Sequence, residues 1–275
     1  MKPARILTIA GSDCSGGAGL QADLKTITML GGYGMSAITA ITAQNTRGVF
    51  AVEPLSPDMV AAQIDACIDD IGVDAVKIGM LGSAGVAHIV ADRLEKIDAP
   101  VVFDPVMIAT SGGILADSET IAAFGRLMAL AALTTPNLPE LEALGGEEAV
   151  RGKTKALLIK GGHGEGPVIE DRLLVDGGEF TFTSQRVDTR HTHGTGCTLA
   201  SAIATGLGQG IAMDDAVDRA ITYIGMAIRS APQLGAGHGP LGHSLGRKPI
   251  YDAIADQRGE DWRPIDVAAK WGDTP

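Results

Sequence analysis

The amino-acid sequence predicts an α/β protein with a mostly parallel sheet that ends in an antiparallel edge. Through the first half, short β-branched apolar runs alternate with segments of helical periodicity, the pattern of parallel strands joined by crossover helices. Later, residues 173–187 are interrupted by Asp176-Gly177-Gly178, which is typical of a hairpin. At 275 residues and 45% hydrophobic composition, the chain can form one large domain with a sizeable core.

The individual strands and helices follow from the spacing of apolar residues. Expected strands are residues 5–10, 35–43, 75–78, 101–103, 133–135 and 156–159. Apolar stripes at helical spacing predict helices that contain Leu20, Leu24 and Ile27; Val60, Ile64, Ile68 and Ile71; Val86, Val90, Leu94 and Ile97; and Val217, Ile221, Ile224 and Ile228. Ser56, which precedes Pro57, and Ser83 stand at N-cap positions, and Gly194 opens a further helix rich in small residues.

The overall charge and the cysteine content restrict the class of protein. A formal net charge of -11 argues against binding to nucleic acid or to an anionic membrane, since both require a positive field. Cys14, Cys67 and Cys197 are too scattered for a disulfide framework or a CxxC metal site, which favours a reducing compartment. The first apolar run is too short for a signal peptide or a membrane span. We therefore expect a cytoplasmic protein.

Two phosphate-binding motifs near the N-terminus are incomplete. Residues 17–22 match the dinucleotide fingerprint, but the next expected strand is followed by Gln44-Asn45 instead of the acidic residue that would hold a ribose. Gly19 and Lys25-Thr26 have the spacing of a P-loop, yet Leu24 occupies the position of its second glycine. We expect Lys25 and Thr26 to lie on the solvated side of an ordinary helix.

The strongest site signal is a glycine-rich turn, His193-Gly194-Thr195-Gly196-Cys197, that leads directly into a helix. Such a turn directs unpaired backbone N–H groups and the positive end of the helix dipole at one point, which predicts an anion site. The same dipole would lower the pKa of the Cys197 thiol, so that Cys197 could accept a proton from a substrate hydroxyl. Taken alone, Cys197 is better explained as a small residue in a closely packed helix.

Three further segments should meet this turn at the carboxyl ends of parallel strands, where open α/β sheets bind ligands. They are Asp104-Pro105-Val106-Met107, Asn137-Leu138-Pro139-Glu140 and Lys160-Gly161-Gly162. Asp104 and Glu140 could hold a hydrated Mg²⁺ that bridges phosphates, and Lys160 could neutralise the phosphate chain. Singly, each could be a strand-end turn residue or a helix cap; together they form the parts of a phosphoryl-transfer site.

The histidines next to the glycine-rich turn suggest a zinc site. Closed zinc sites need four ligands, however, and no convincing fourth accompanies His191, His193 and Cys197. Structural hydrogen bonding by the two histidines is therefore favoured.

The acceptor side of the expected site begins with the loop from Gly11 to Gly19, whose missing side chains would let a flat ring approach the backbone. Asp23 and Gln44 could recognise that ring. A carboxamide places an acceptor beside a donor, which complements an amino group next to a ring nitrogen. An exposed Asp23 on its helix and a Gln44 that caps a strand are equally compatible with the two residues alone.

The ordered motifs of the chain closely resemble those of a known family. They are Thr8-Ile9-Ala10-Gly11-Ser12-Asp13, residues 15–26, Ala43-Gln44-Asn45-Thr46, Lys77-Ile78-Gly79-Met80-Leu81, Asp104-Pro105-Val106-Met107, residues 135–140, Lys160-Gly161-Gly162-His163 and His193-Gly194-Thr195-Gly196-Cys197. From about residue 6 to 243, the chain resembles the hydroxymethylpyrimidine/phosphomethylpyrimidine kinases of the ribokinase-like superfamily.

This resemblance implies a three-layer α/β/α fold, a homodimer and two successive ATP-dependent phosphorylations of 4-amino-5-hydroxymethyl-2-methylpyrimidine in thiamine biosynthesis. It assigns Gln44 and Asp23 to the pyrimidine, with Gly11, Met80 and Met107 in its pocket. It assigns residues 194–196 to the anion hole, with Thr195 also facing the nucleotide, and Cys197 to the proton-accepting position. Asp104, Asn137, Glu140 and Lys160 would serve Mg²⁺ and the phosphates of ATP.

Two departures and two alternative functions accompany the resemblance. Only 19 residues separate Glu140 from Lys160, so one flank of the sheet could be thinly covered, and the sequence after residue 243 is atypical. We expect a single kinase domain over residues 1–246 and a tail of unknown role over 247–275. The alternatives are a pyridoxal or pyridoxine kinase on the same scaffold and a non-catalytic pyrimidine-binding regulatory protein.

Overall fold

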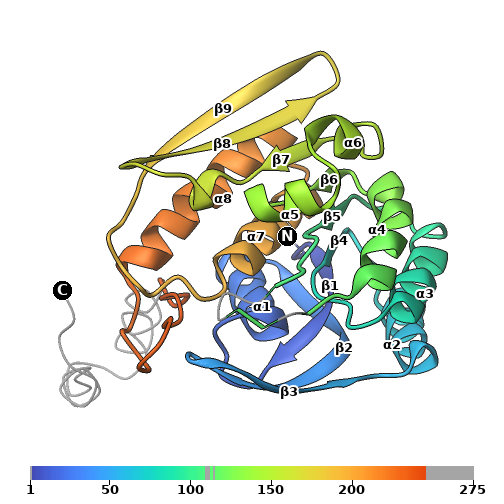
Figure 1. Ribbon diagram of the computed structural model, residues 1–275. Helices are drawn as coiled ribbons and strands as arrows, with labels where there is room; N and C mark the ends of the chain where they lie inside the picture. Colours follow the sequence, from blue (N-terminus) through green and yellow to red (C-terminus); the bar gives the residue numbers. More distant parts are fainter. Residues whose placement is uncertain (1, 109–111, 114, 246–275) are drawn as a thin grey trace, which may run out of the picture. The chain divides into compact units, whose positions relative to one another are not determined.

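The computed structural model describes residues 2–108, 112, 113 and 115–245, which contain a nine-stranded sheet in the order β3-β2-β1-β4-β5-β6-β7-β8-β9 (Figure 1). The strands are β1 (Arg5–Asp13), β2 (Tyr33–Asn45), β3 (Gly48–Pro54), β4 (Ala75–Ile78), β5 (Val101–Phe103), β6 (Leu133–Thr134), β7 (Leu157–Ile159), β8 (Val168–Val175) and β9 (Gly178–Gln185). Strands β2, β1, β4, β5, β6 and β7 pair in parallel, which confirms the expected mostly parallel sheet.

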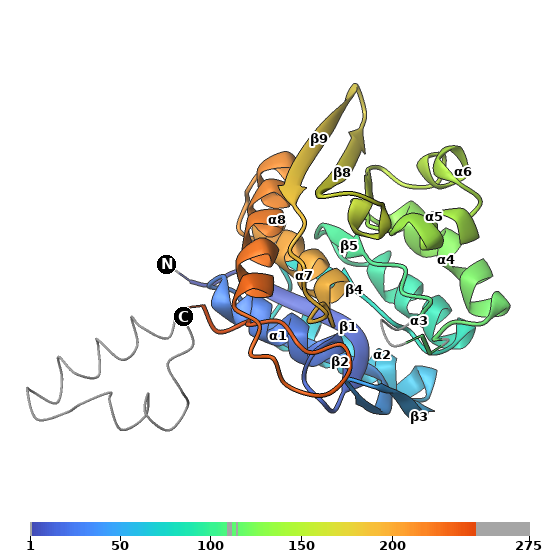
Figure 2. The same cartoon turned by 60° about the vertical axis from the view of Figure 1, so that its left-hand side comes forward.

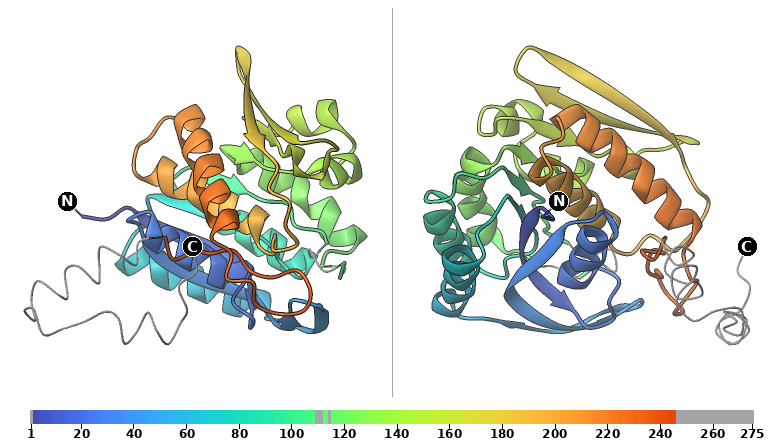
Figure 3. Two further views of the ribbon diagram at one scale, coloured as in Figure 1. Left: turned by 90° about the vertical axis from the view of Figure 1, so that its left-hand side faces the viewer. Right: turned by 180° about the vertical axis from the view of Figure 1, so that it is seen from behind.

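Both ends of the sheet are antiparallel. The expected hairpin is present as β8 and β9, although β8 begins at Val168, before the predicted range (Figure 3). The other end is β3, which pairs with β2 and which the sequence did not predict. Residues 50–54 of β3 are all exposed, so β3 lacks the alternation of buried and solvated residues by which a half-buried strand is detected.

Helices cover both faces of the sheet. They are α1 (Gly19–Met29), α2 (Pro57–Asp70), α3 (Ala84–Leu94), α4 (Ser118–Leu130), α5 (Leu138–Ala143), α6 (Glu147–Arg151), α7 (Thr195–Gly208) and α8 (Met213–Arg229). Helices α2, α3 and α4 pack side by side on one face, and α1, α7 and α8 pack on the other (Figures 1 and 2). The three-layer architecture is therefore confirmed.

Local capping explains where several helices start. The hydroxyls of Ser56 and Ser83 accept hydrogen bonds from the backbone N–H groups of Met59 and Val86, as their N-cap positions predict. Helix α4 was not predicted, although the Asp117 carboxylate caps it in the same way. Helix α5 begins at Leu138, before Glu140, and helix α6 lies within the short crossover between Glu140 and Lys160.

The described residues up to His243 form one compact unit. The predicted domain boundary at residue 246 lies outside the described residues. The expected tail, residues 247–275, falls outside the described residues. No described helix has both the length and the apolar character that crossing a membrane requires.

Candidate active site

A cavity of about 1130 Å³ opens where the carboxyl ends of the parallel strands meet the N-terminus of α7. Twelve predicted site residues line it: Gly11, Gln44, Met80, Asp104, Met107, Asn137, Glu140, Lys160, Gly194, Thr195, Gly196 and Cys197. Open α/β sheets bind ligands at this edge because loops from successive strands converge there. Every predicted site residue except Asp23 therefore lines this cavity.

The glycine-rich turn forms the start of α7. Gly194 is the N-cap and has φ +88°, in the left-handed region, and a Cβ on it would collide with the carbonyl oxygen of Gly17. Gly196 lies beside the reactive groups, since a Cβ there would be 3.4 Å from both Asp104 Oδ2 and Lys160 Nζ. The Thr195 N–H donates to the Thr192 carbonyl, but the other N–H groups of this helix start lie beside a lysine, which suits an anion.

Lys160 follows β7 and is held between two carboxylates. Its Nζ donates to Asp104 Oδ1 at 2.7 Å and lies 3.7 Å from Glu140 Oε2. The Thr135 hydroxyl donates to the same Asp104 oxygen at 3.1 Å. Although burial opposes it, the charges of Asp104 and Glu140 raise the pKa of the Lys160 ammonium. Lys160 therefore stays charged beside the anion site.

Glu140 has a structural task in addition to its place in the cavity. Its Oε2 accepts from the Asn137 backbone N–H at 2.8 Å, while Asn137 Oδ1 accepts from the Glu140 N–H at 2.9 Å. This capping box starts α5 and fixes both side chains at the cavity wall. Burial raises the pKa of the Glu140 carboxyl despite the opposing charge of Lys160.

The expected acidity of Cys197 is wrong for the protein without ligands. Burial raises the pKa of its thiol to about 11, and the negative charges of Asp23 and Asp104 add to the rise, whereas Lys77 opposes it. The helix dipole that was expected to lower the pKa is outweighed by desolvation. At neutral pH, Cys197 is therefore a thiol at the first turn of α7.

Asp23 does not lie where it was expected. Its side chain is fully buried beneath the cavity, where Lys77 Nζ donates to both carboxylate oxygens at 3.0 and 2.8 Å. Thr8 and Ser201 donate to Asp23 at 2.6 and 2.8 Å. All of these partners are protein groups, so the structure gives Asp23 no direct contact with a ring in the cavity. It ties α1 to β1, β4 and α7 instead.

The acceptor side of the cavity contains Gln44, Gly11 and Met80. Gln44 is buried, and its side-chain amide lies 3.3 Å from the Thr42 hydroxyl and 3.4 Å from His193 Nε2. A Cβ on Gly11 would be 3.0 Å from Met80 Sδ, so a glycine at this position leaves room for the Met80 side chain, which lines the pocket. Met107 is also buried at the cavity surface.

Asp13 and His193 are site residues that sequence reasoning did not assign. His193 Nε2 lies 2.8 Å from Asp13 Oδ2. Asp13 also accepts from the Ser15 hydroxyl and from backbone N–H groups at 15, 17 and 18, which fixes the glycine-rich loop before α1. The expected structural hydrogen bonding thus holds for His193. Among the described residues, no group of three or more His, Cys, Asp or Glu side chains could hold a metal ion.

Lys25 and Thr26, which have the spacing of a P-loop, lie in two different environments. Lys25 is exposed, as expected, and its Nζ donates to the Gly16 carbonyl at 2.7 Å. The prediction for Thr26 is wrong, because Thr26 is fully buried and donates to the Ala22 carbonyl. Thr26 lies three residues after Asp23 and therefore on the buried face of α1.

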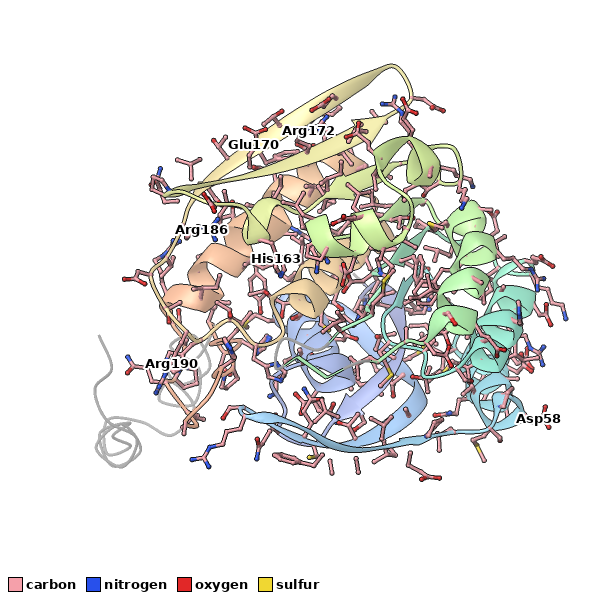
Figure 4. The ribbon with its side chains drawn as sticks, viewed as in Figure 1. Asp58, His163, Glu170, Arg172, Arg186 and Arg190 are labelled. Atoms are coloured by element: carbon pink, nitrogen blue, oxygen red, sulfur yellow. The ribbon has the colours of Figure 1, made fainter. Side chains whose placement is uncertain are left out.

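Arg186 fixes a glycine-rich loop at the wall of the cavity, and sequence reasoning did not identify it. Its guanidinium donates to the carbonyls of Gly162, Gly164 and Gly166, each at 2.8 Å. The loop follows Lys160 and carries His163, and both Arg186 and His163 line the cavity (Figure 4).

The fold is that of the ribokinase-like class. The family model described as phosphomethylpyrimidine kinase matches residues 13–242, and the chain belongs to this family. A hydroxymethylpyrimidine/phosphomethylpyrimidine kinase of Rhizobium meliloti is 46% identical over 255 residues, covering 86% of this chain and 96% of that protein. A bifunctional thiamine biosynthesis protein of Geobacter sulfurreducens is 48% identical over 263 residues and 90% of this chain, which spans about half (54%) of that longer protein.

Solved structures agree with this assignment. A phosphomethylpyrimidine kinase from Clostridium difficile superposes with a TM-score of 0.72 and 41% identity, covering 82% of this chain and 99% of that one. A Bacillus subtilis pyridoxal kinase in complex with ADP superposes with a TM-score of 0.81 and 33% identity, covering 90% and 99%. The scaffold is thus shared by kinases named for two different acceptors.

Proposed function

We propose that this chain is an ATP-dependent kinase that phosphorylates 4-amino-5-hydroxymethyl-2-methylpyrimidine and then its monophosphate in thiamine biosynthesis. The observation that carries the proposal is the meeting, in one cavity, of the α7 anion site, the Lys160 cluster and the Gln44 pocket. An acceptor ring held at Gln44 and a phosphate held at α7 would face each other. The names of the related kinases support the same activity.

Phosphoryl transfer at this site would rely on positioning and charge. The backbone N–H groups of Gly194, Gly196 and Cys197 and the Lys160 ammonium would hold the transferred phosphoryl group as negative charge moves during in-line displacement. Holding the two substrates in line makes the reaction effectively unimolecular, which can supply several powers of ten in rate. Thr195 lines the cavity at the start of α7, and because its backbone N–H donates to the Thr192 carbonyl at 3.3 Å, its hydroxyl is the group that would contact the same phosphate.

Cys197 is the group best placed to receive the proton of the acceptor hydroxyl. It is one residue after Gly196 and lines the cavity beside the anion site. Its raised thiol pKa means that the thiolate forms only at high pH in the protein without ligands. Proton acceptance by Cys197 would therefore give a rate that increases with pH.

Asp104 and Glu140 fit a magnesium site that is completed by phosphates. Both contribute oxygen atoms within 3.7 Å of the same Lys160 nitrogen, so they share one wall of the cavity. Magnesium bound there would neutralise charge on the phosphates of ATP, and such ions in kinases commonly use one or two carboxylates together with waters and phosphate oxygens. Asn137 orients Glu140 toward this position through the capping box.

A homodimer is the assembly that we propose, and the edge strand β3 supports it. Ile41 of β2 and Phe50 and Val52 of β3 are exposed by 44%, 69% and 38%. An unpaired strand edge with apolar side chains is suited to pairing with a second copy. Unpaired cysteines and the acidic composition support a cytoplasmic location without nucleic-acid or membrane partners.

Pyridoxal kinase is the second candidate function, favoured by the TM-score of 0.81 to a pyridoxal kinase. A coupled ATPase assay with hydroxymethylpyrimidine, its monophosphate and pyridoxal separates the candidates. We expect kcat/KM to be highest for the two pyrimidines. A higher value for pyridoxal would reverse the order of the candidates, and binding of the pyrimidine without turnover would support the non-catalytic alternative.

A further inference from the structure

The loop that follows Lys160 is rich in glycine, with four glycines among residues 161–166. Gly166 has φ +93°, in the left-handed region, and a Cβ on Gly162 would meet no atom within 4 Å. Glycines with so few close neighbours lose much conformational freedom when a loop becomes ordered. A single conformation of this loop therefore depends on contacts from other parts of the chain.

Arg186 directly follows β9 and supplies three of those contacts (Figure 4). Its Nε, Nη1 and Nη2 donate to the carbonyls of Gly166, Gly162 and Gly164, each at 2.8 Å. Its own backbone N–H donates to the Pro167 carbonyl at 2.8 Å, which extends the ladder between β8 and β9. One planar guanidinium, anchored by the hairpin, thus holds three alternate carbonyls of the loop.

The start of the loop is fixed to β8 by other groups. The Gly161 N–H donates to Asp171 Oδ1 at 2.8 Å, and a Cβ on Gly161 would collide with the Glu170 carbonyl oxygen. Because these contacts do not involve Arg186, a replacement of Arg186 should free the rest of the loop and leave Lys160 in place.

The order of the strands places the loop on the side of the anion site opposite to the acceptor pocket. Gln44 belongs to β2 and Lys160 follows β7, and β1, β4, β5 and β6 lie between these strands in the sheet. The anion turn joins the two sides, because Gly194 packs against Gly17 and Gly196 lies beside Lys160. With an acceptor ring at Gln44 and a phosphoryl group at the turn, the rest of ATP would extend toward β7, β8 and β9.

We propose that Arg186 is a positioning residue for the nucleotide, because it orders residues 162–166 as a preformed wall of the nucleotide side of the cavity. This inference rests on the proposed function. Gly162 and His163 form the part of the loop that lines the cavity, and Arg186 acts on the nucleotide through them. Because the loop is ordered before the nucleotide binds, binding does not lose the entropy of ordering it.

Arg186→Met tests the proposal because it removes all three side-chain hydrogen bonds to the loop. We expect the KM for ATP to rise by about tenfold or more, while kcat at saturating ATP and the KM for the pyrimidine change by less than about twofold. This split between KM and kcat separates positioning of the nucleotide from a general loss of structure. Arg186→Lys keeps the charge but presents one nitrogen in place of three, so it should recover only part of the loss.

Arg172→Met is the matched control, because Arg172 belongs to the same hairpin and does not line the cavity (Figure 4). Its guanidinium also makes three hydrogen bonds, two to Glu179 and one to Glu147. We expect Arg172→Met to keep the wild-type KM for ATP. An unchanged KM for ATP in Arg186→Met, full recovery in Arg186→Lys, or the same rise in Arg172→Met would overturn the proposal.

Nucleotide binding separates this inference from the proposed function. A wild-type protein that phosphorylates neither hydroxymethylpyrimidine nor pyridoxal would contradict the proposed function. Calorimetric titration with ATP and Mg²⁺ then tests the inference alone. We expect Arg186→Met to bind ATP about tenfold more weakly than the wild type, with a less favourable entropy of binding. Equal affinities, or no binding of ATP by the wild type, would overturn the inference.

Discussion

Two lysines of this protein are each paired with an aspartate at nearly the same distance, yet they occupy different environments. Lys77 Nζ lies 2.8 Å from Asp23, and both side chains are completely buried. Lys160 Nζ lies 2.7 Å from Asp104, and the Lys160 side chain is 12% exposed at the cavity. The two ion pairs have nearly the same length and differ in their exposure. The comparison teaches that a lysine–aspartate pair can serve a binding site only where a ligand can reach it.

The partners of each pair strengthen this distinction. Thr8 and Ser201 complete the hydrogen bonds of Asp23, so the Lys77 pair is satisfied entirely by the protein. Lys160 instead faces two carboxylates at one end of an anion site, where a phosphate could attract the same ammonium. The charges of both pairs act on Cys197: those of Asp23 and Asp104 raise the pKa of its thiol and that of Lys77 lowers it.

The largest expected effect comes from Cys197. General-base contributions are about 100- to 10,000-fold, so Cys197→Ala should lower kcat into that range with little change in ATP binding. The raised thiol pKa predicts that wild-type kcat increases with pH up to about 11, and that Cys197→Ala loses this dependence. Cys197→Asp should retain more activity than Cys197→Ala, since a carboxylate can take the same proton. Wild-type turnover in Cys197→Ala would return Cys197 to a packing role.

Replacing each lysine with methionine tests the comparison directly. Lys77→Met leaves a buried carboxylate without its partner, and we expect a loss of about 3–5 kcal/mol in the free energy of unfolding, measured in urea. Lys160→Met should lower kcat by about 100- to 1,000-fold, the size typical of a lost oxyanion donor, with a smaller loss of stability. Equal losses of stability in the two variants would remove the distinction between the pairs.

The smallest expected effect concerns Glu140, which lies at the edge of the Lys160 cluster. Glu140→Gln keeps the volume of the side chain and an oxygen for the capping box, but it removes the charge that would hold Mg²⁺. Activity should fall several-fold at low Mg²⁺ and recover in part at high Mg²⁺. A loss that does not depend on Mg²⁺ concentration would limit Glu140 to its role in starting α5.

Much of this architecture could be predicted from the sequence, because apolar periodicity reports burial. Residues 75–78 and 101–103 are strands with the predicted bounds, and twelve expected site residues line one cavity. The sequence could not place Asp23, because its partner Lys77 is 54 residues away within an apolar strand. The acidity of Cys197 was also mispredicted, since desolvation depends on the packing around α7 and outweighs the helix dipole.

The most direct test of the proposed activity is to follow the pyrimidine itself. The wild-type protein is incubated with hydroxymethylpyrimidine, ATP and Mg²⁺, and the products are measured by mass spectrometry beside those of Lys160→Met. We expect the wild type to form the monophosphate and then the diphosphate, and Lys160→Met to form the monophosphate at about one-hundredth of that rate or less. A folded wild-type protein that leaves the pyrimidine unphosphorylated, or a Lys160→Met variant that is equally fast, would contradict this account.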